Sequence, residues 1–262
     1  MTALHRPLRT VEAELIAYRR TWRGTVISSF VNPIFFLSAM GLGLGALVDR
    51  GDSGLGIPYI TFVATGLMAA TAMQSGAGDG SFPIMAGIKW RKEFHATITT
   101  PMTPADIIIG RSLWGIIRLS FILVVFTVIA GLFGALELRT ALMAIPPAVL
   151  TGIAFTTIVT AFTITQNDST SLTTLFRFGI TPLFLFSGTF FPITNLPEAF
   201  QYVAYATPLF HGVELVRKIA LPGIGTDMVT SIPIWAHFAY LAVMAVTGLF
   251  LAARLLDRKL RP

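Results

Sequence analysis

The side chains that could do chemistry are sparse in this sequence, and their spacing argues against a catalytic or metal centre. The four histidines (His5, His95, His211 and His237) stand far apart, and there is no cysteine for a disulfide or a thiolate metal site. No lysine follows a glycine, so the chain lacks the phosphate-binding loop of ATPases. No histidine lies well inside an apolar stretch beside a serine or an acid, as an intramembrane hydrolase would need. We therefore expect no catalytic residue, no metal site and no cofactor bound directly to this chain.

Three ionisable side chains fall within or beside apolar stretches, where a charge often marks a transport pathway. Arg118 and Arg177 lie inside such stretches, and Asp79 stands between two glycines near the end of another. We expect the arginines to reach the membrane surface or to pair with an acid such as Asp168, in preference to direct substrate contact. An ion-coupled transporter would depend on Asp79 or Arg177, and that alternative stays open.

Six long apolar stretches must position these side chains, and each is close to the ~20 residues that a helix needs to cross ~30 Å of hydrocarbon. Hydrophobic residues make up 54% of the chain and charged residues only 12%, whereas soluble domains carry about 25% charged residues. Closed β-barrels would instead show short alternating segments. We predict an all-α integral membrane protein with one transmembrane domain over residues 1–262. Its six spans are expected at 25–48, 59–75, 107–133, 141–164, 172–191 and 232–256.

The basic residues predict the orientation of the chain. They gather beside the ends of the apolar stretches, whereas a nucleic-acid-binding protein would carry them along one polar face, so we expect membrane lipids and no nucleic acid as partners. By the positive-inside rule both termini face the cytoplasm, which an even number of spans allows. The first stretch is too long for a signal-peptide core, and we expect it to be retained. The residues on the cytoplasmic side are Arg6, Arg9, Arg19, Arg20, Arg23, Lys89, Arg91, Lys92, Arg111, Arg254, Arg258, Lys259 and Arg261.

An amphipathic helix is predicted over residues 8–23, directly before the first span. Its apolar residues recur at steps of three and four, and its other positions are rich in charge. We favour a helix that lies on the cytoplasmic membrane surface, with packing against a partner protein as the alternative. The apolar face consists of Leu8, Val11, Leu15, Tyr18 and Trp22.

The loop at 89–106, between the second and third spans, is the most informative polar segment and falls on the cytoplasmic side. Thr103 can cap the third span, with Asp106 in the first turn where a carboxylate suits the helix dipole. A short helix that ends before Pro101 is predicted upstream. It would present one apolar face able to dock on another protein, and an ordinary solvated turn is the alternative. That face consists of Trp90, Phe94 and Ile98.

The segment 192–228, between the fifth and sixth spans, is the longest region outside the spans and falls on the external side. Its prolines divide it into two short helices, which Asn195 and Thr207 can cap. Both helices are apolar enough to dip back into the membrane surface as re-entrant helices. We therefore expect a partly buried external structure rather than a free loop.

The second of these external helices carries three ionisable residues of interest. His211 and Glu214 are three apart and could pair, although a satisfied interfacial histidine is favoured over a ligand or a proton relay. Arg217 lies in the last turn, where a cation suits the helix dipole. The face expected to pack consists of Leu209, Val213, Val216 and Ala220.

Two segments resemble the permeases of type 2 ABC exporters. The first is 93–111 (EFHATITTPMTPADIIIGR), which resembles their coupling-loop region. The second is 187–197 (SGTFFPITNLP), followed by Pro208-Leu209, His211 and Val216-Arg217, and it resembles the nodulation-factor and daunorubicin exporter branch. With six expected spans and an amphipathic first helix, the resemblance covers nearly the whole chain.

The resemblance implies a half-transporter of a bacterial plasma membrane. Two such permeases, identical or homologous, would bind two nucleotide-binding ABC ATPase subunits, which would hold ATP and Mg²⁺. The complex would export a hydrophobic or amphipathic compound, with drug, lipid and lipid-linked glycan all open. The sequence lacks the obvious ladder of aromatic residues expected of carbohydrate exporters. An ion-coupled transporter and a membrane scaffold that moves nothing remain as alternatives.

The resemblance also implies roles for particular residues. ATPase coupling would fall to the cytoplasmic loop, the translocation pathway to the first and fifth spans, and the outer gate to the external segment. The coupling residues would be Arg91, Glu93, Phe94, His95, Thr100 and Pro101; the pathway residues Asn32, Phe176, Arg177, Phe184 and Phe186; and the gate residues Phe191, Pro192, Leu196, Pro208 and His211.

Overall fold

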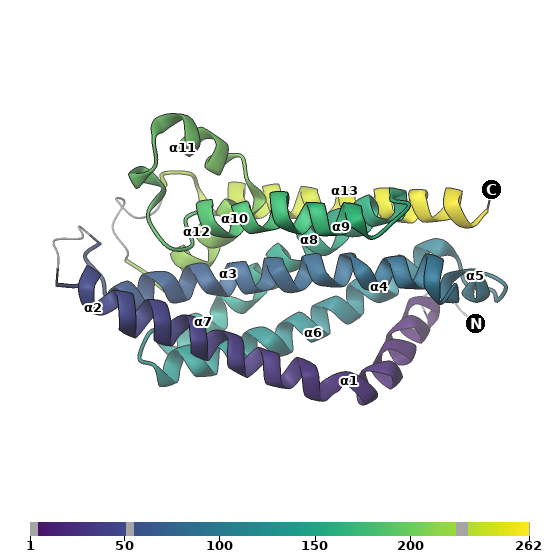
Figure 1. Ribbon diagram of the computed structural model, residues 1–262, viewed down its shortest axis with the longest axis horizontal. Coiled ribbons are helices and arrows are strands. Elements are labelled where there is room, and N and C mark those ends of the chain that lie inside the picture. Colours follow the sequence, from purple (N-terminus) through teal and green to yellow (C-terminus); the bar gives the residue numbers. More distant parts are fainter. Residues whose placement is uncertain (1–4, 51–54, 224–229, 262) are drawn as a thin grey trace.

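The computed structural model describes residues 5–50, 55–223 and 230–261, and this part of the chain is helical without a strand (Figure 1). The predicted all-α class is confirmed. The ends of the predicted domain 1–262, and residues 224–228 of the external segment 192–228, lie outside the described residues. The helices are α1 (Arg6–Phe36), η2 (Leu37–Leu44), α2 (Gly45–Val48), α3 (Tyr59–Gly80), α4 (Phe82–Met85), η3 (Ala86–Trp90), α5 (Glu93–Thr97), α6 (Pro104–Leu132), α7 (Leu138–Met143), α8 (Ile145–Thr165), α9 (Thr170–Leu175), η4 (Phe176–Ile180), α10 (Thr181–Phe186), η5 (Ile193–Asn195), α11 (Glu198–Tyr205), α12 (Pro208–Ala220) and α13 (Ile234–Leu260).

Four helical stretches of the described chain are long and apolar enough to cross a membrane. Two further segments of the expected six spans differ from this pattern. Helix α3 is long enough to cross a membrane but is less apolar than the four stretches. Most of its side chains contact protein rather than lipid, so they need not be strongly apolar. The expected fifth span is a shorter apolar stretch, Thr170–Phe186, made of α9, η4 and α10. The four stretches are Arg6–Val48, Pro104–Leu132, Leu138–Thr165 and Ile234–Leu260.

Helix α3 runs through the middle of the bundle, between α1 and α6 on one side and α10 and α13 on the other (Figure 1). Phe62, Met68 and Met73 on α3 are completely buried. The helix approaches α8 so closely that a Cβ atom on Gly76 would lie 2.1 Å from the carbonyl oxygen of Gly152. Glycines at this crossing let the two backbones touch, which fixes α3 in the centre of the molecule.

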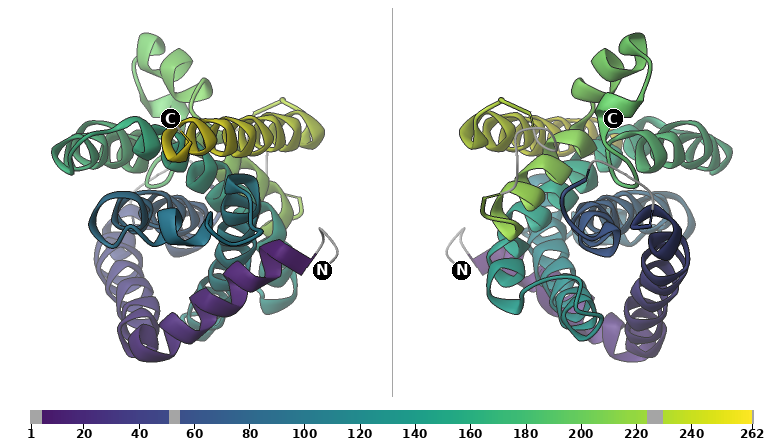
Figure 2. Two further views of the ribbon diagram at one scale, coloured as in Figure 1. Left: turned by 90° about the vertical axis from the view of Figure 1, so that its right-hand side faces the viewer. Right: turned by 90° about the vertical axis from the view of Figure 1, so that its left-hand side faces the viewer.

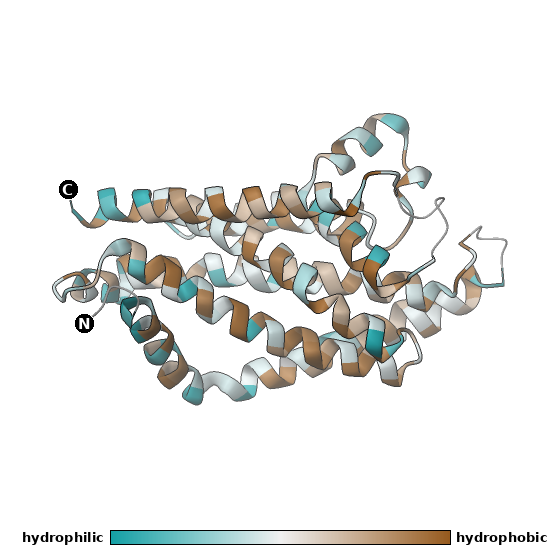
Figure 3. Ribbon diagram, turned by 180° about the vertical axis from the view of Figure 1, so that it is seen from behind, coloured by the Kyte–Doolittle hydropathy of each residue, from teal (hydrophilic) through white to brown (hydrophobic). Residues whose placement is uncertain are grey.

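Helix α1 bends sharply, and its shorter arm crosses the end of the bundle (Figures 1 and 2). Hydrophilic residues gather on this arm, whereas the longer arm is mostly hydrophobic (Figure 3). The predicted amphipathic helix 8–23 and the first span are therefore parts of one bent helical stretch, because no residue between them ends the helix. The N-terminal arm, α5 and the C-terminal end of α13 lie at the same end of the bundle (Figure 1).

Most of the predicted apolar face of this arm does not pack on the bundle. Leu8, Leu15 and Trp22 are exposed, by 49%, 45% and 45%. The arm packs on α6 at Gly110, where an added Cβ atom would lie 2.5 Å from the Pro7 carbonyl oxygen. This approach turns the backbone of the arm toward α6, together with Tyr18, whose ring meets that of Trp114 edge-on. It leaves Leu8, Leu15 and Trp22 on the outside, as suits a helix at a membrane surface.

Two helix starts follow the sequence prediction and one does not. The Thr103 side chain accepts from the backbone N–H of Asp106 at 3.2 Å, and the Asp106 carboxylate accepts from the backbone N–H of Thr103 at 2.8 Å, so the cap of α6 is confirmed. Thr207 caps α12 by accepting from the backbone N–H of Phe210. The predicted cap at Asn195 is wrong, because Asn195 ends η5 and α11 begins three residues later, after Pro197.

Candidate functional site

The short helix α5 is held against the bundle by one side chain. Phe94 is only 3% exposed, and its ring fills the space above Gly87, where an added Cβ atom would lie 2.6 Å from the ring. The predicted docking face of this helix is therefore wrong in part. Phe94 points inward, Ile98 is half-buried, and only Trp90, in η3, is largely exposed at 59%. The reason is the preceding turn, where Lys92 takes a left-handed conformation (φ 53°) and reorients the helix. The apolar neighbours of Phe94 include Ile84, Ile88, Ile107, Ile108, Leu256 and Leu260.

The other residues implied in coupling lie on the outside of this loop. Arg91 and Glu93 form an exposed ion pair, with Nη2 and Oε1 2.9 Å apart. His95, Thr100 and Pro101 are exposed. A protein that approaches this end of the bundle can therefore contact all of these side chains, whereas it would not reach Phe94.

Behind α5, two ion pairs join two helices, α1 and α3, to one face of α6. Arg111 of α6 pairs with Glu14 of α1, and its guanidinium carbon lies 5.6 Å from the centroid of the Phe94 ring. Two turns further along α6, Arg118 pairs with Asp79 of α3. These contacts surround a cavity of about 480 Å³ between α1, α5 and α6. Helix α5 is thus in contact with α6 through the Phe94 ring and Arg111, and α6 is joined to α1 and α3 by side chains of opposite charge.

Arg118 pairs with an acid, as expected, but the acid named as an example, Asp168, is wrong. Asp79, not Asp168, pairs with Arg118, because α3 and α6 pack together in the bundle. The Asp168 carboxylate instead accepts from the backbone N–H groups of Thr170 and Ser171, at 2.9 and 3.3 Å, at the start of α9. Within the described chain Arg177 has no ion pair and is exposed, with its guanidinium carbon 5.7 Å from the Phe178 ring centroid.

Three of the five residues implied in the pathway lie on the outer surface of the bundle. Asn32 on α1 is exposed, as are Arg177 and Phe186 on the stretch Thr170–Phe186. Phe184 contacts Phe36 of α1 edge-on, with ring centroids 5.8 Å apart. This ring contact joins α1 to the stretch Thr170–Phe186, while the exposed residues of both face away from the core. Phe176, the remaining residue of the set, is half-buried and stacks on Phe82.

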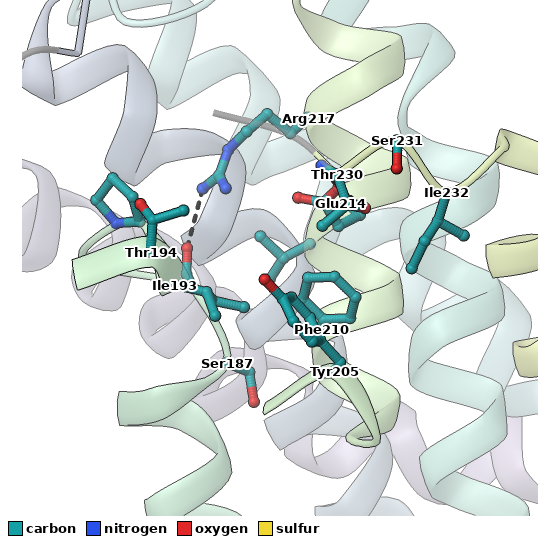
Figure 4. A pocket seen from close by; sticks show the side chains of 13 residues that line it. Ser187, Ile193, Thr194, Tyr205, Phe210, Glu214, Arg217, Thr230, Ser231 and Ile232 are labelled. Carbon is teal, nitrogen blue, oxygen red and sulfur yellow. Dashed lines mark hydrogen bonds between the residues drawn. The ribbon is translucent and has the colours of Figure 1, made fainter. Parts of the chain in front are cut away.

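At the opposite end of the bundle, a pocket of about 460 Å³ lies between α12 and the chain that follows α10 (Figure 4). Arg217 of α12 points into this region and is only 2% exposed. Its Nη2 donates to the carbonyl oxygens of Gly188 and Phe62, at 3.0 and 3.4 Å, and its Nε donates to Thr65 Oγ1 at 3.3 Å. The arginine thereby joins α12, α3 and the segment after α10.

Sequence reasoning missed this role of Arg217 and treated it as a cation of the last helical turn. The predicted packing face of α12 is nevertheless confirmed, since Leu209, Val213 and Val216 are at most 1% exposed. Arg217 lies four residues after Val213, on that same face. The signal was therefore present: a charged residue within a buried helical face implies a specific partner.

The possible pair of His211 and Glu214 does not form, and His211 is instead a histidine satisfied by other partners, which is the interpretation favoured from the sequence. His211 Nδ1 lies 2.8 Å from Nδ1 of His237 on α13, and its ring stacks on Tyr240 with centroids 4.0 Å apart. Glu214 Oε2 accepts from the backbone N–H of Thr230 at 2.8 Å. Both residues are thus used to attach α12 to the chain around the start of α13. The other residues implied in the gate, Phe191, Pro192, Leu196 and Pro208, are half-buried around the pocket and the short helices.

The whole-chain comparison with known proteins decides the family. The model of the ABC-2 type transporter family matches residues 9–221. The chain belongs to the ABC-2 type transporter family. The resemblance seen in the sequence is therefore confirmed. An ABC-2 permease is a multi-pass membrane subunit, in agreement with the four long apolar helices of the described chain.

Known ABC-2 permeases match nearly the full length of the chain. It is 31% identical over 250 residues to nodulation protein J of Rhizobium meliloti (strain 1021), which covers 94% of this chain and 91% of that protein. It is 30% identical to nodulation protein J of Sinorhizobium fredii (strain NBRC 101917 / NGR234), with 94% and 90% covered. The inner membrane transport permease YadH of Escherichia coli (strain K12) is 21% identical, with 94% and 92% covered.

Proposed function

We propose that this ABC-2 permease is the transmembrane subunit of an ATP-driven exporter of a hydrophobic or amphipathic substrate: a drug, a lipid or a lipid-linked glycan. A separate nucleotide-binding subunit would bind ATP and Mg²⁺ and supply the energy. The observation that carries this proposal is the placement of α5, which is exposed along Arg91 and Glu93 and anchored inward by Phe94. A partner that moves α5 would move α1, α3 and α6 through the ion pairs of Arg111 and Arg118.

The proposed topology has six spans in a bacterial plasma membrane, with both termini in the cytoplasm. Helix α3 would be a span shielded from lipid by its neighbours, and Thr170–Phe186 would be the fifth span. The end of the bundle that carries α5 and both termini would be cytoplasmic, because most of the basic residues outside the spans gather there. The end that carries α11 and α12 would be external.

The transport pathway would form between two permeases, identical or homologous, each with its own ATPase subunit. The outer surface of α1 and of Thr170–Phe186 supports this, because it carries Asn32, Arg177 and Phe186 away from the core of a single chain. The external pocket lies beside the segment that follows α10, so the residues from Phe191 to His211 would form the outer gate. In this arrangement Arg217 would hold the gate helix α12 to α3.

Copurification tests the proposal most directly. The tagged chain, isolated in mild detergent from its native cells, should bring with it a nucleotide-binding ATPase in equal amount, measured by quantitative mass spectrometry. Glu93→Gln should weaken the coupling of ATP hydrolysis to transport, since Glu93 is an exposed charge of the coupling loop. The control is Glu137→Gln, which removes an exposed acid immediately before α7.

The outcomes separate the possible functions. If the Glu93→Gln variant binds the ATPase and its ATP hydrolysis stays fully coupled to transport, the loop 89–106 is not the coupling loop. An oligomer without an ATPase that transports along an ion gradient would support a secondary transporter, and an oligomer that transports nothing would support a scaffold.

A further inference from the structure

A groove of about 640 Å³ lies between the start of α6 and the last turns of α13, at the end of the bundle that also carries α5. One ridge of α13 lines it with Phe250, Arg254, Arg258 and Arg261, which recur at steps of four and three and so share a helix face. The opposite wall consists of Thr103, Pro104 and Ala105. The groove is thus apolar at one end and cationic at the other.

The charges of this groove are not balanced by the protein. Asp257 is the one acid among the residues that line it, and it pairs with Arg261 at 3.6 Å. Among the described residues, Arg254 and Arg258 have no acidic partner, and both are exposed. They stand four residues apart, where like charges on a helix repel each other. An anion placed between them would remove this repulsion.

A neighbouring cation shows a different arrangement. Lys259, one residue beyond Arg258, turns to α8 and donates to the carbonyl oxygens of Ile164 and Gln166. The helix end is therefore already fixed to the bundle by Lys259. Arg254 and Arg258 are not needed for that attachment.

The same ridge continues as an apolar surface away from the charges. Val243, Val246 and Phe250 are 65%, 66% and 51% exposed, and hydrophobic residues follow the hydrophilic end of α13 along the helix (Figure 3). The guanidinium carbon of Arg254 lies 4.2 Å from the Phe250 ring centroid, at the border between the two regions. A ligand that matches this ridge has an anionic head and a hydrocarbon chain.

We propose that this groove binds one anionic phospholipid of the cytoplasmic leaflet. Its phosphate would lie between Arg254 and Arg258, and an acyl chain would follow Phe250 and Val246. Basic pockets between helices at this level of a membrane hold acidic headgroups in this way. The proposal does not depend on export, but it rests on the proposed topology, in which this end of α13 lies at the cytoplasmic surface.

Native mass spectrometry of the purified full chain tests it, with phosphatidylglycerol and phosphatidylcholine of identical acyl chains supplied in equal amounts. The wild-type chain should retain phosphatidylglycerol selectively. Arg254→Gln with Arg258→Gln should lower that retention by about 30-fold, since each cation near a membrane surface contributes roughly fivefold. The matched control is Arg19→Gln with Arg20→Gln, which removes two exposed charges from α1. The control should retain the lipid as the wild type does.

A second variant tests the contact with the acyl chain of the lipid separately from the contact with its headgroup. Phe250→Ser should lower the retention of long-chain phosphatidylglycerol and leave a short-chain analogue unaffected. Unchanged retention in the double groove variant, or an equal loss in the α1 control, would overturn the proposal. Displacement of the lipid by free inorganic phosphate would instead assign the groove to a soluble anion. Loss of a copurifying ATPase with full lipid retention would assign it to a protein contact.

Discussion

The guanidinium carbon of Arg217 lies 4.0 Å from the ring centroid of Phe62, deep in the bundle. The contact joins α12 to the central helix α3, and the same guanidinium donates a hydrogen bond to the Gly188 carbonyl oxygen of the segment after α10. Three parts of the chain that are far apart in sequence therefore depend on one cation. A cation over an aromatic ring and in hydrogen bonds to carbonyl oxygens is well stabilised without an acidic partner.

Arg217→Ala is expected to lower the free energy of unfolding by about 3 kcal/mol, because it leaves buried carbonyl oxygens without their charged donor. Arg217→Lys should recover only part of this loss, because an ammonium cannot reproduce the planar fork of hydrogen bonds. Thermal unfolding of the purified protein in detergent measures both changes. Arg139→Ala, at an exposed position of α7, is the control. Equal stability of the Arg139 and Arg217 variants would contradict the role of Arg217.

The crossing of α3 and α8 offers a sharper comparison, because α3 carries two glycines two residues apart. Gly76→Ala would place a Cβ atom 2.1 Å from the Gly152 carbonyl oxygen, whereas a Cβ atom on Gly78 meets nothing within 4 Å. We expect Gly76→Ala to destabilise the protein by about 1–3 kcal/mol through overpacking. Gly78→Ala should be neutral or stabilising by up to about 1 kcal/mol, because alanine favours the helix. Thermal unfolding in detergent measures both changes, and equal melting temperatures of the two variants would disprove the close approach of the helices.

The helical class, the cap of α6 at Thr103 and the packing face of α12 could be predicted from the sequence because they depend on local chemistry. The spacing of apolar residues predicts which face of a helix packs, and a threonine directly before a proline predicts where a helix begins. The bent α1 could not be predicted in the same way, since the side that packs is decided by Gly110 of α6. A glycine that opens room for another helix has no signature in the sequence of that other helix.

The partners of the ionisable residues could not be identified from local spacing, for a related reason. Sequence distance allowed Glu214 as a partner of His211, but Nδ1 of His237 on α13 lies 2.8 Å from Nδ1 of His211. Likewise Asp168 is near Arg177 in sequence, yet its carboxylate accepts a hydrogen bond from the backbone N–H of Thr170 at the start of α9. Partners across a bundle are set by which helices pack together, and this information is absent from local spacing.

The burial of Phe94 predicts that α5 depends on this one ring. Phe94→Ala should cost about 3–5 kcal/mol of local or global stability, because it opens a cavity above Gly87. Trp90→Ala removes a larger side chain that is 59% exposed, and it should have little effect on stability. Hydrogen exchange over residues 86–103 measures the local change, and the melting temperature measures the global one. Equal protection of the loop in both variants would show that Phe94 does not anchor α5.

The pair of Asp79 and Arg118 predicts a non-additive response to mutation. Asp79→Asn or Arg118→Gln alone leaves one charge largely buried, and each should destabilise the protein by about 3 kcal/mol. Replacing both residues by Leu and Met should cost less than either single change, because no charge is then left unpaired. The exposed pair of Arg9 and Glu12, with both side chains 58% exposed, is the matched control. A double-mutant cycle on that pair should give a coupling energy of about 0–1 kcal/mol. Additive losses at Asp79 and Arg118 would mean that the two side chains act independently. A coupled pair allows a further test of the neutral double variant, provided that it still hydrolyses ATP with its partner subunit. Transport by this variant would show whether the contact between α6 and α3 transmits the movement of α5 to the spans.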